Sequence, residues 1–219
     1  MRENSAIEHL AIGFFYRGHT LTLDGWLWKL PDIPSRLAAL KEYNVSEQST
    51  DPRRMTDDEA AEFAEQVFDL ARKGDARLLG LLLEKNLTPN LRNHKGDTLL
   101  MLACYHGHLE AARVLLDYKA DPEIRNDNGQ SPIAGAAFKG DLEMVQLLVE
   151  HGAEVEGASA DGRTALMMAA MFNRSEIVAF LVSKGANPHA RDAKGVTALA
   201  AAQTMGASDT AEMLSKFGV

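Results

Sequence analysis

The chain of 219 residues has an apolar fraction of 46%, a charged fraction of 25% and a formal net charge of −8. This balance is ordinary for a globular chain, and it argues against general binding to nucleic-acid phosphates, which requires clustered Lys and Arg. No apolar run reaches the roughly 18 residues of a membrane span, so we expect neither a membrane segment nor a secretory signal. The single cysteine, Cys104, allows no internal disulfide and favours a cytoplasmic location.

Residues 1–56 contain both tryptophans of the chain and differ in pattern from everything that follows. Residues 20–23 alternate as a strand does, Asp24-Gly25 is a turn signal, and Trp26–Trp28 could pair back as a hairpin. Residues 33–43 have helical spacing, and polar residues 46–54 resemble a linker. Three interpretations stay open for this extension. Its aromatic residues could pack on the first repeat as a cap, the extension could be partly disordered, or it could form a separate partner-binding hairpin.

A helix pair is predicted directly after this extension. Thr56 to Glu59 form a capping box, which opens a helix that runs to Lys73 and ends at Gly74. A second helix is expected from about 75 to 85, and Pro89 closes the unit.

The remainder of the chain repeats with a period of about 33 residues, kept by two registers of glycine. One register holds Gly96, Gly129, Gly162 and Gly195, each followed two positions later by Thr98, Ser131, Thr164 or Thr197. The other holds Gly74, Gly107, Gly140 and Gly206, with Asn173 in the remaining slot. Each unit is expected to have a turn, a hydroxyl that caps a short inner helix, a Gly or Asn, and a longer outer helix. The predicted units are 57–89, 90–122, 123–155, 156–188 and 189–219.

The period, the turn glycines and segments such as Lys184–Pro188 and Gly140–Val145 resemble the ankyrin family, in particular short ankyrin-repeat proteins of bacteria. The resemblance covers about 57–219 and implies an all-α solenoid of helix-turn-helix units with β-turn or hairpin tips, here preceded by an irregular N-terminal extension. The family's Thr-Pro-Leu-His tetrapeptide is only partly kept, because its His is missing from all four units. We therefore do not expect the hydroxyl–imidazole hydrogen bonds of the family.

The resemblance also implies a non-catalytic module that binds another protein through its turn tips and the concave side of its inner helices. Two adjacent positions before each helix-ending residue supply candidate anchors, since aromatic and Met side chains are common anchors of interfaces. The candidate anchors are Tyr105, His106, Phe138, Lys139, Met171 and Phe172, with Thr204 and Met205 at the same positions of the last unit. The candidate tip residues are His94, Lys95, Asp127, Asn128 and Arg163, and Lys194 and Val196 belong to the same tips. The alternative is that some of these rings belong to the ordinary core.

The segment from Cys104 to His108 is the one place that suggests metal or thiol chemistry. A structural zinc site needs four ligands, and no fourth ligand lies nearby in the sequence. A thiol nucleophile needs a base within a cleft, which a helix-turn surface does not provide. We therefore predict no catalytic residue, no metal and no cofactor, with Cys104 as a partly buried packing residue.

Arg92, Arg125 and Arg191 recur near the tips and could form a basic row facing an acidic partner. Asn93, Asn126 and Asp192 lie beside them, so we favour local hydrogen bonding within each turn.

Two other functions stay open. Some bacterial ankyrin proteins that look like this one support oxidative-stress defence beside catalases. The extension could also carry an activity that the repeats target. A monomer is the default expectation.

Overall fold

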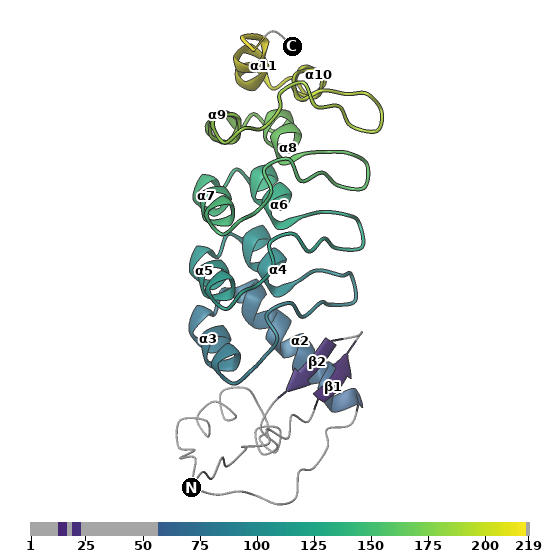
Figure 1. Ribbon diagram of the computed structural model, residues 1–219, viewed down its shortest axis with the longest axis vertical. Helices are drawn as coiled ribbons and strands as arrows, with labels where there is room; N and C mark the ends of the chain where they lie inside the picture. The colour runs from purple at the N-terminus through teal and green to yellow at the C-terminus, as the bar shows by residue number, and fades with distance from the viewer. Residues whose placement is uncertain (1–12, 17–18, 23–56, 218–219) are drawn as a thin grey trace, which may run out of the picture.

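The computed structural model describes residues 13–16, 19–22 and 57–217 of the chain, and in the last range ten helices stack in pairs (Figure 1). The inner row is α2 (Asp57–Lys73), α4 (Leu99–His106), α6 (Pro132–Lys139), α8 (Ala165–Met171) and α10 (Ala198–Met205). The outer row is α3 (Ala76–Glu84), α5 (Leu109–Asp117), α7 (Leu142–Glu150), α9 (Ser175–Ser183) and α11 (Ser208–Ser215). Each helix contacts the next helix of its own row, which confirms the predicted all-α solenoid.

The core is built from side chains that recur at the repeat period. One leucine at the same position of each outer helix is almost completely buried: Leu82, Leu115, Leu148, Leu181 and Leu214. Small residues occupy the matching positions of the inner helices, where Ala103, Ala136, Ala169 and Ala202 have no exposed surface. Burial of one leucine side chain contributes about 1.5–3 kcal/mol. Each unit therefore gains its stability from the unit that covers it.

Both predicted glycine registers have left-handed backbone conformations. The tip glycines have φ between 73° and 79°, and the glycines between inner and outer helices have φ between 70° and 84°. A side chain at such a φ is strained, which is why glycine recurs there. At Gly129 a Cβ atom would also lie 2.9 Å from the Ala160 amide nitrogen of the next tip. The glycines thus set the turns, and Gly129 also allows the next tip to approach closely.

The predicted hydroxyl caps are found in three of the four repeats. Thr98 accepts a hydrogen bond from the Met101 amide at 3.1 Å, and Thr164 and Thr197 make the equivalent bonds in their units. The expectation was wrong for Ser131, whose side chain makes no capping bond. Pro132 follows it at the first helical position, and its fixed φ favours the helix start without the hydroxyl.

Side chains at the first position of three predicted units bind the loop that ends the same unit. Their oxygens accept backbone N–H groups located 31 residues later, at 2.8–2.9 Å, in the pairs Asn90–Asp121, Glu123–Glu154 and Glu156–Asn187. The first residue of each of these units thereby holds the start and the end of the unit together.

Within the extension, the structure describes one hairpin. Strand β1 (Gly13–Tyr16) pairs antiparallel with β2 (His19–Thr22), and β1 lies against α2. The predicted strand at 20–23 thus pairs with the preceding residues, whereas its expected partner, Trp26–Trp28, lies outside the described residues. The predicted helix at 33–43 and the cap residue Thr56 also lie outside them. The division at residue 56 and the unit boundaries remain predictions.

No helix in the described parts of the chain is long and apolar enough to span a membrane.

Asn173 replaces the glycine between α8 and α9, with φ of 57°. Its side-chain oxygen accepts the amides of Asp209 and Thr210, each at 3.1 Å, and its amide donates to the Asp209 carboxylate at 2.9 Å. The N-cap of α11, Ala207, offers no side-chain acceptor. Asn173 therefore caps the outer helix of the following unit.

We predict that Asn173→Gly destabilises the protein by about 1 kcal/mol, because the cap is lost while the left-handed turn is kept. Asn173→Ala should cost about 2 kcal/mol, because the turn is strained as well. Urea denaturation followed by circular dichroism measures both. Gln203→Ala, at an exposed position of α10, is the matched control, and a Gly variant as stable as the wild type would refute the capping role.

Candidate functional site

The candidate anchors lie at the C-terminal ends of the inner helices, and neighbouring units bring them together in diagonal pairs. The ammonium of Lys139 lies 4.2 Å from the centre of the Tyr105 ring, a cation–π distance. The rings of Phe138 and Phe172 meet edge to face, with centroids 4.5 Å apart and planes at 85°. In both pairs, the first anchor position of one unit contacts the second anchor position of the next. We call the surface formed by these ends and the tips the inner-helix face.

Burial differs along this row of anchors. The side chain of Tyr105 is 46% exposed, and His106 and Lys139 are also exposed. Phe138, Met171 and Phe172 are half-buried. The alternative interpretation of these rings as core is thus partly right for the two phenylalanines, which cover each other while keeping part of their surface in solvent.

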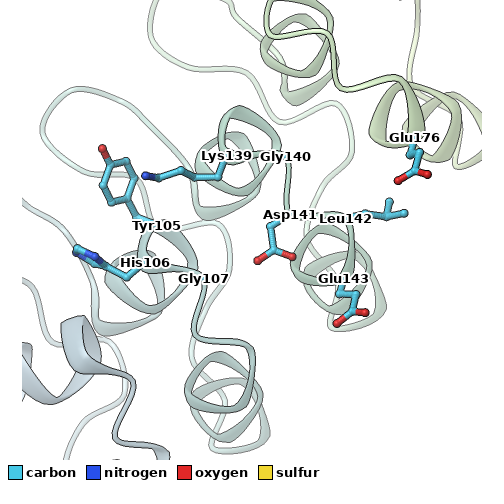
Figure 2. Close-up of a pocket in the computed structure, with 9 residues that line it drawn as sticks. All are labelled: Tyr105, His106, Gly107, Lys139, Gly140, Asp141, Leu142, Glu143 and Glu176. Carbon is cyan, nitrogen blue, oxygen red and sulfur yellow. The ribbon is translucent and has the colours of Figure 1, made fainter.

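A hollow of about 660 Å³ opens where α4 and α6 turn into the outer helices (Figure 2). Tyr105, His106 and Lys139 line one side of it. The other side carries three carboxylates that sequence reasoning missed, those of Asp141, Glu143 and Glu176. The sequence did contain a signal for Glu143 and Glu176. Together with Glu110, they recur once per repeat near the starts of the outer helices.

The electrostatics of this hollow favour an uncharged His106. Its partial burial lowers the pKa of its imidazole, and the nearby positive groups of His108, Lys139 and Arg72 lower that pKa further. Asp141 has a structural role, because its carboxylate accepts the Met144 amide at the start of α7 at 3.0 Å. The hollow therefore presents charges of both signs, with the Lys139 ammonium on the side of His106 and Tyr105 and the carboxylates on the opposite side.

The tips are ordered by side chains that bind their own turns. The side-chain oxygen of Asn93 accepts the amides of Lys95 and Asp97 at 2.8 and 2.9 Å, and Asn126 and Asp192 repeat this pattern. Arg92 and Arg191 donate to the carbonyls of Gly96 and Gly195 in their own turns. The predicted hydrogen bonding within each turn is confirmed for Arg92 and Arg191.

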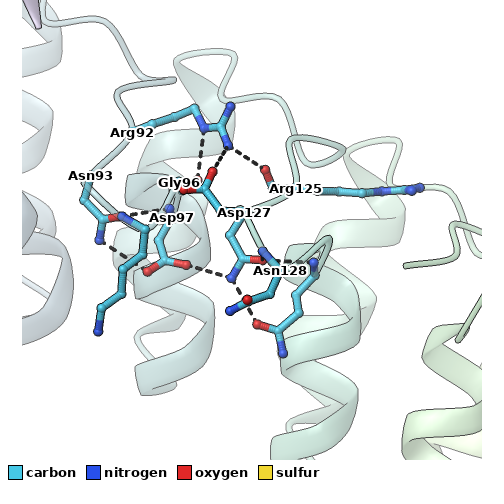
Figure 3. A network of polar contacts seen from close by, with 10 residues as sticks. Arg92, Asn93, Gly96, Asp97, Arg125, Asp127 and Asn128 are labelled. Carbon is cyan, nitrogen blue, oxygen red and sulfur yellow. Dashed lines mark hydrogen bonds and ion pairs between the residues drawn. The ribbon is translucent and has the colours of Figure 1, made fainter. Parts of the chain in front are cut away.

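Neighbouring tips are also connected to each other (Figure 3). Arg92 donates to the Arg125 carbonyl at 3.0 Å and pairs with the Asp127 carboxylate at 3.2 Å. The Asp127 amide donates to the Lys95 carbonyl at 3.0 Å. These contacts hold the first two tips together at the edge of the inner-helix face.

The candidate tip residues differ in their availability to a partner. His94, Lys95, Asp127 and Asn128 are exposed, whereas Arg163 is half-buried. Arg163 lies 3.3 Å from Asp161 of its own tip and 3.9 Å from Asp192 of the next. It is therefore already engaged within the protein.

Cys104 is a core residue, more deeply buried than we expected. It has no exposed surface, and it occupies the slot that Ala71, Ala137 and Ala170 fill in other units. Desolvation is the main cause that raises the pKa of its thiol far above the ordinary value, and the charge of Asp141 adds to it. His108 lies 2.8 Å from the Arg72 carbonyl through Nε2, a contact between units. In the part of the chain described, no three His, Cys, Asp or Glu side chains are grouped as metal ligands.

Stacked helix pairs with ordered hairpin tips, repeated along the chain, define a helical-repeat solenoid. A family model described as ankyrin repeats (three copies) matches residues 67–158 and 154–219. The chain therefore belongs to the ankyrin-repeat family.

Two curated relatives match only parts of the chain. A Pseudomonas aeruginosa protein named as an ankyrin repeat protein is 61% identical over 63 residues, which are 29% of this chain and 37% of that protein. An E3 ubiquitin-protein ligase of Arabidopsis thaliana is 47% identical over 45 residues, 20% of this chain and 9% of the ligase. The chain thus spans well under two thirds of the length of these relatives.

We predict that Cys104 of the folded protein reacts with Ellman's reagent at pH 8 roughly 100-fold more slowly than in urea, because the thiol is buried and protonated. Absorbance at 412 nm follows the reaction. A double variant, Cys104→Ala with Thr204→Cys, provides an exposed thiol as the control. Equal rates for Cys104 and this control in the folded state would contradict the assignment.

We also predict that the protein loses stability as the pH falls below about 6.5. The lowered pKa of His106 means that the unfolded chain takes up this proton first, so acid favours unfolding until the pH passes the folded-state pKa. NMR titration of the imidazole and urea midpoints at several pH values measure this effect. Lys139→Gln should raise the pKa of His106, and His106→Gln should remove its share of the pH dependence. An unchanged titration in Lys139→Gln would refute the electrostatic part of the argument.

Proposed function

We propose that this protein is a non-catalytic recognition module that binds another protein through its inner-helix face and tips. The observation that carries the proposal is the row of diagonal contacts, in which Lys139 covers Tyr105 and Phe172 packs on Phe138. Aromatic side chains held in this way lose little further freedom on binding, which favours their use as anchors. The proposed contact residues are Tyr105, His106, Phe138, Lys139, Met171 and Phe172, with His94, Lys95, Asp127, Asn128 and Arg163 along the tips.

The proposed module works without a cofactor or a catalytic residue, as a monomer in the cytoplasm. Its partner is another protein and not a nucleic acid, since residues 57–219 contain 16 basic and 24 acidic side chains. The hollow in Figure 2 would receive polar groups of the partner, because it offers positive and negative side chains at once. No described residue favours the oxidative-stress role or an activity of residues 1–56.

The test is affinity capture from native lysate, with mass spectrometry of bound proteins, using the wild type and the Phe138→Ala/Phe172→Ala double variant. We expect the variant to lose the partner, with binding weakened at least tenfold, because truncation of two central anchors typically costs more than about 1 kcal/mol each. Circular dichroism must show that the variant keeps its fold.

Tyr118→Ala is the matched control, because Tyr118 is 39% exposed but follows outer helix α5. A partner that is retained by the double variant and lost by Tyr118→Ala would place the binding site on the outer helices. A partner that both variants retain would also refute the proposed site.

A further inference from the structure

A groove of about 240 Å³ lies between the last two units, beside helices α8 and α10 and the hairpin tips that precede them. Its apolar lining includes Met167, Met171, Val196 and Met205. Arg163, Asp192 and Lys194 border it. Met167 is buried with 2% of its surface exposed, whereas Met205 is 51% exposed. The groove therefore has an apolar floor and an open apolar side.

The position of the groove follows from the diagonal pairing of anchors. Tyr105 with Lys139 and Phe138 with Phe172 are the first two diagonals, and each is closed by a direct contact. Met171 with Met205 is the third diagonal by sequence position, and both side chains line the groove. Unbranched thioether side chains adapt readily to different partner shapes. At the third diagonal, a side chain of a partner protein can pack against Met171, as Lys139 packs on Tyr105 and Phe172 on Phe138 in the first two.

The tip of the last unit extends this apolar surface. Val196 occupies the slot that holds Asp97, Gln130 or Arg163 in the preceding units, and its side chain lines the groove. The side chain of Val196 is half-buried and makes no hydrogen bond to the turn. The turn is instead ordered by Asp192, which accepts the Lys194 and Val196 amides. A contiguous apolar surface of this kind marks an interaction site more often than an isolated exposed residue does.

The border of the groove carries charges of both signs, and Lys194 is the exposed cation among them. Arg163 is balanced by Asp161 and Asp192, and only 6% of the Asp192 side chain is exposed. Lys194 is exposed and forms no ion pair with any residue in the described ranges. An uncompensated ammonium beside an apolar groove complements a carboxylate that follows an apolar anchor.

We propose that this groove binds one apolar side chain, such as Leu, Met or Phe, from an extended segment of a partner protein, and that Lys194 pairs with an Asp or Glu next to it. The inference rests on the proposed function and adds the chemistry of the segment that is recognised. Residues 57–219 contain 24 acidic and 16 basic side chains, and this negative charge disfavours a strongly acidic partner. We therefore expect a single carboxylate in the bound segment.

The probe is a display library of random heptapeptides, selected on the full-length chain in parallel with a Val196→Gln/Met205→Gln variant. The wild type should enrich peptides with an apolar residue beside Asp or Glu, and the groove variant should not. An enriched peptide, synthesised with a fluorophore, should bind the groove variant at least tenfold more weakly by fluorescence anisotropy, because the apolar contact is lost.

A charge reversal tests the ion pair. Lys194→Glu should weaken the acidic peptide about fivefold and strengthen the same peptide with Lys in place of its acid. Lys119→Glu, the same change at an exposed residue that follows outer helix α5, is the matched control and should leave both affinities unchanged. Peptide affinities that do not change with the sign of the charge at residue 194 would refute the proposed role of Lys194.

Other outcomes separate this inference from the proposed function. If no peptide is enriched, or if enriched peptides depend on Phe138 and Phe172 but not on Val196 and Met205, this inference is wrong while the proposed function stands. A dimer in sedimentation velocity that the groove variant abolishes would assign the groove to a second copy of the chain and also overturn the inference. The proposed function itself fails if the lysate partner is insensitive to Phe138→Ala/Phe172→Ala.

Discussion

The structure depends on burial between neighbouring units, because no helix pair can cover its own apolar side. The leucines from Leu82 to Leu214 are almost fully buried, one in each unit, and each belongs to an outer helix that contacts the next. Small inner-helix residues such as Ala136 allow the units to approach closely. Polar contacts follow the same rule, since the Thr210 hydroxyl donates to the Ala170 carbonyl of the preceding unit at 2.8 Å. Stability in such a stack is approximately a sum of unit and interface contributions.

The candidate binding surface is a product of this stacking. Lys139 covers Tyr105, and Phe172 covers Phe138, only because consecutive units place one anchor position beside the other. The tips are aligned by the same translation, with Arg92 bonded to the carbonyl of Arg125 in the next tip. A change in the spacing of the units would therefore alter the surface even if every side chain on it were kept.

Side chains that could take part in catalysis or metal binding have structural roles in this protein. Cys104 replaces an alanine in the core, where desolvation raises the pKa of its thiol, and His108 contacts the backbone of the preceding unit. Asp141 and Asn173 cap outer helices, the first its own and the second that of the next unit. What remains accessible on the inner-helix face is a row of rings, thioethers and charges, which suits recognition of a protein surface.

The sequence alone determined the period, the helix order and the turns, because a left-handed backbone and a buried helix face impose strict residue types at fixed intervals. It also predicted the candidate anchor positions, since they follow from the same register. Tertiary structure alone decided which anchors meet, how far Phe138 is buried, and that the carboxylates of Glu143 and Glu176 face the hollow beside Tyr105. It likewise showed that Ser131 does not cap its helix and that Val196 joins Met171 and Met205 in one groove. These features depend on distances between units, which a one-dimensional pattern does not contain.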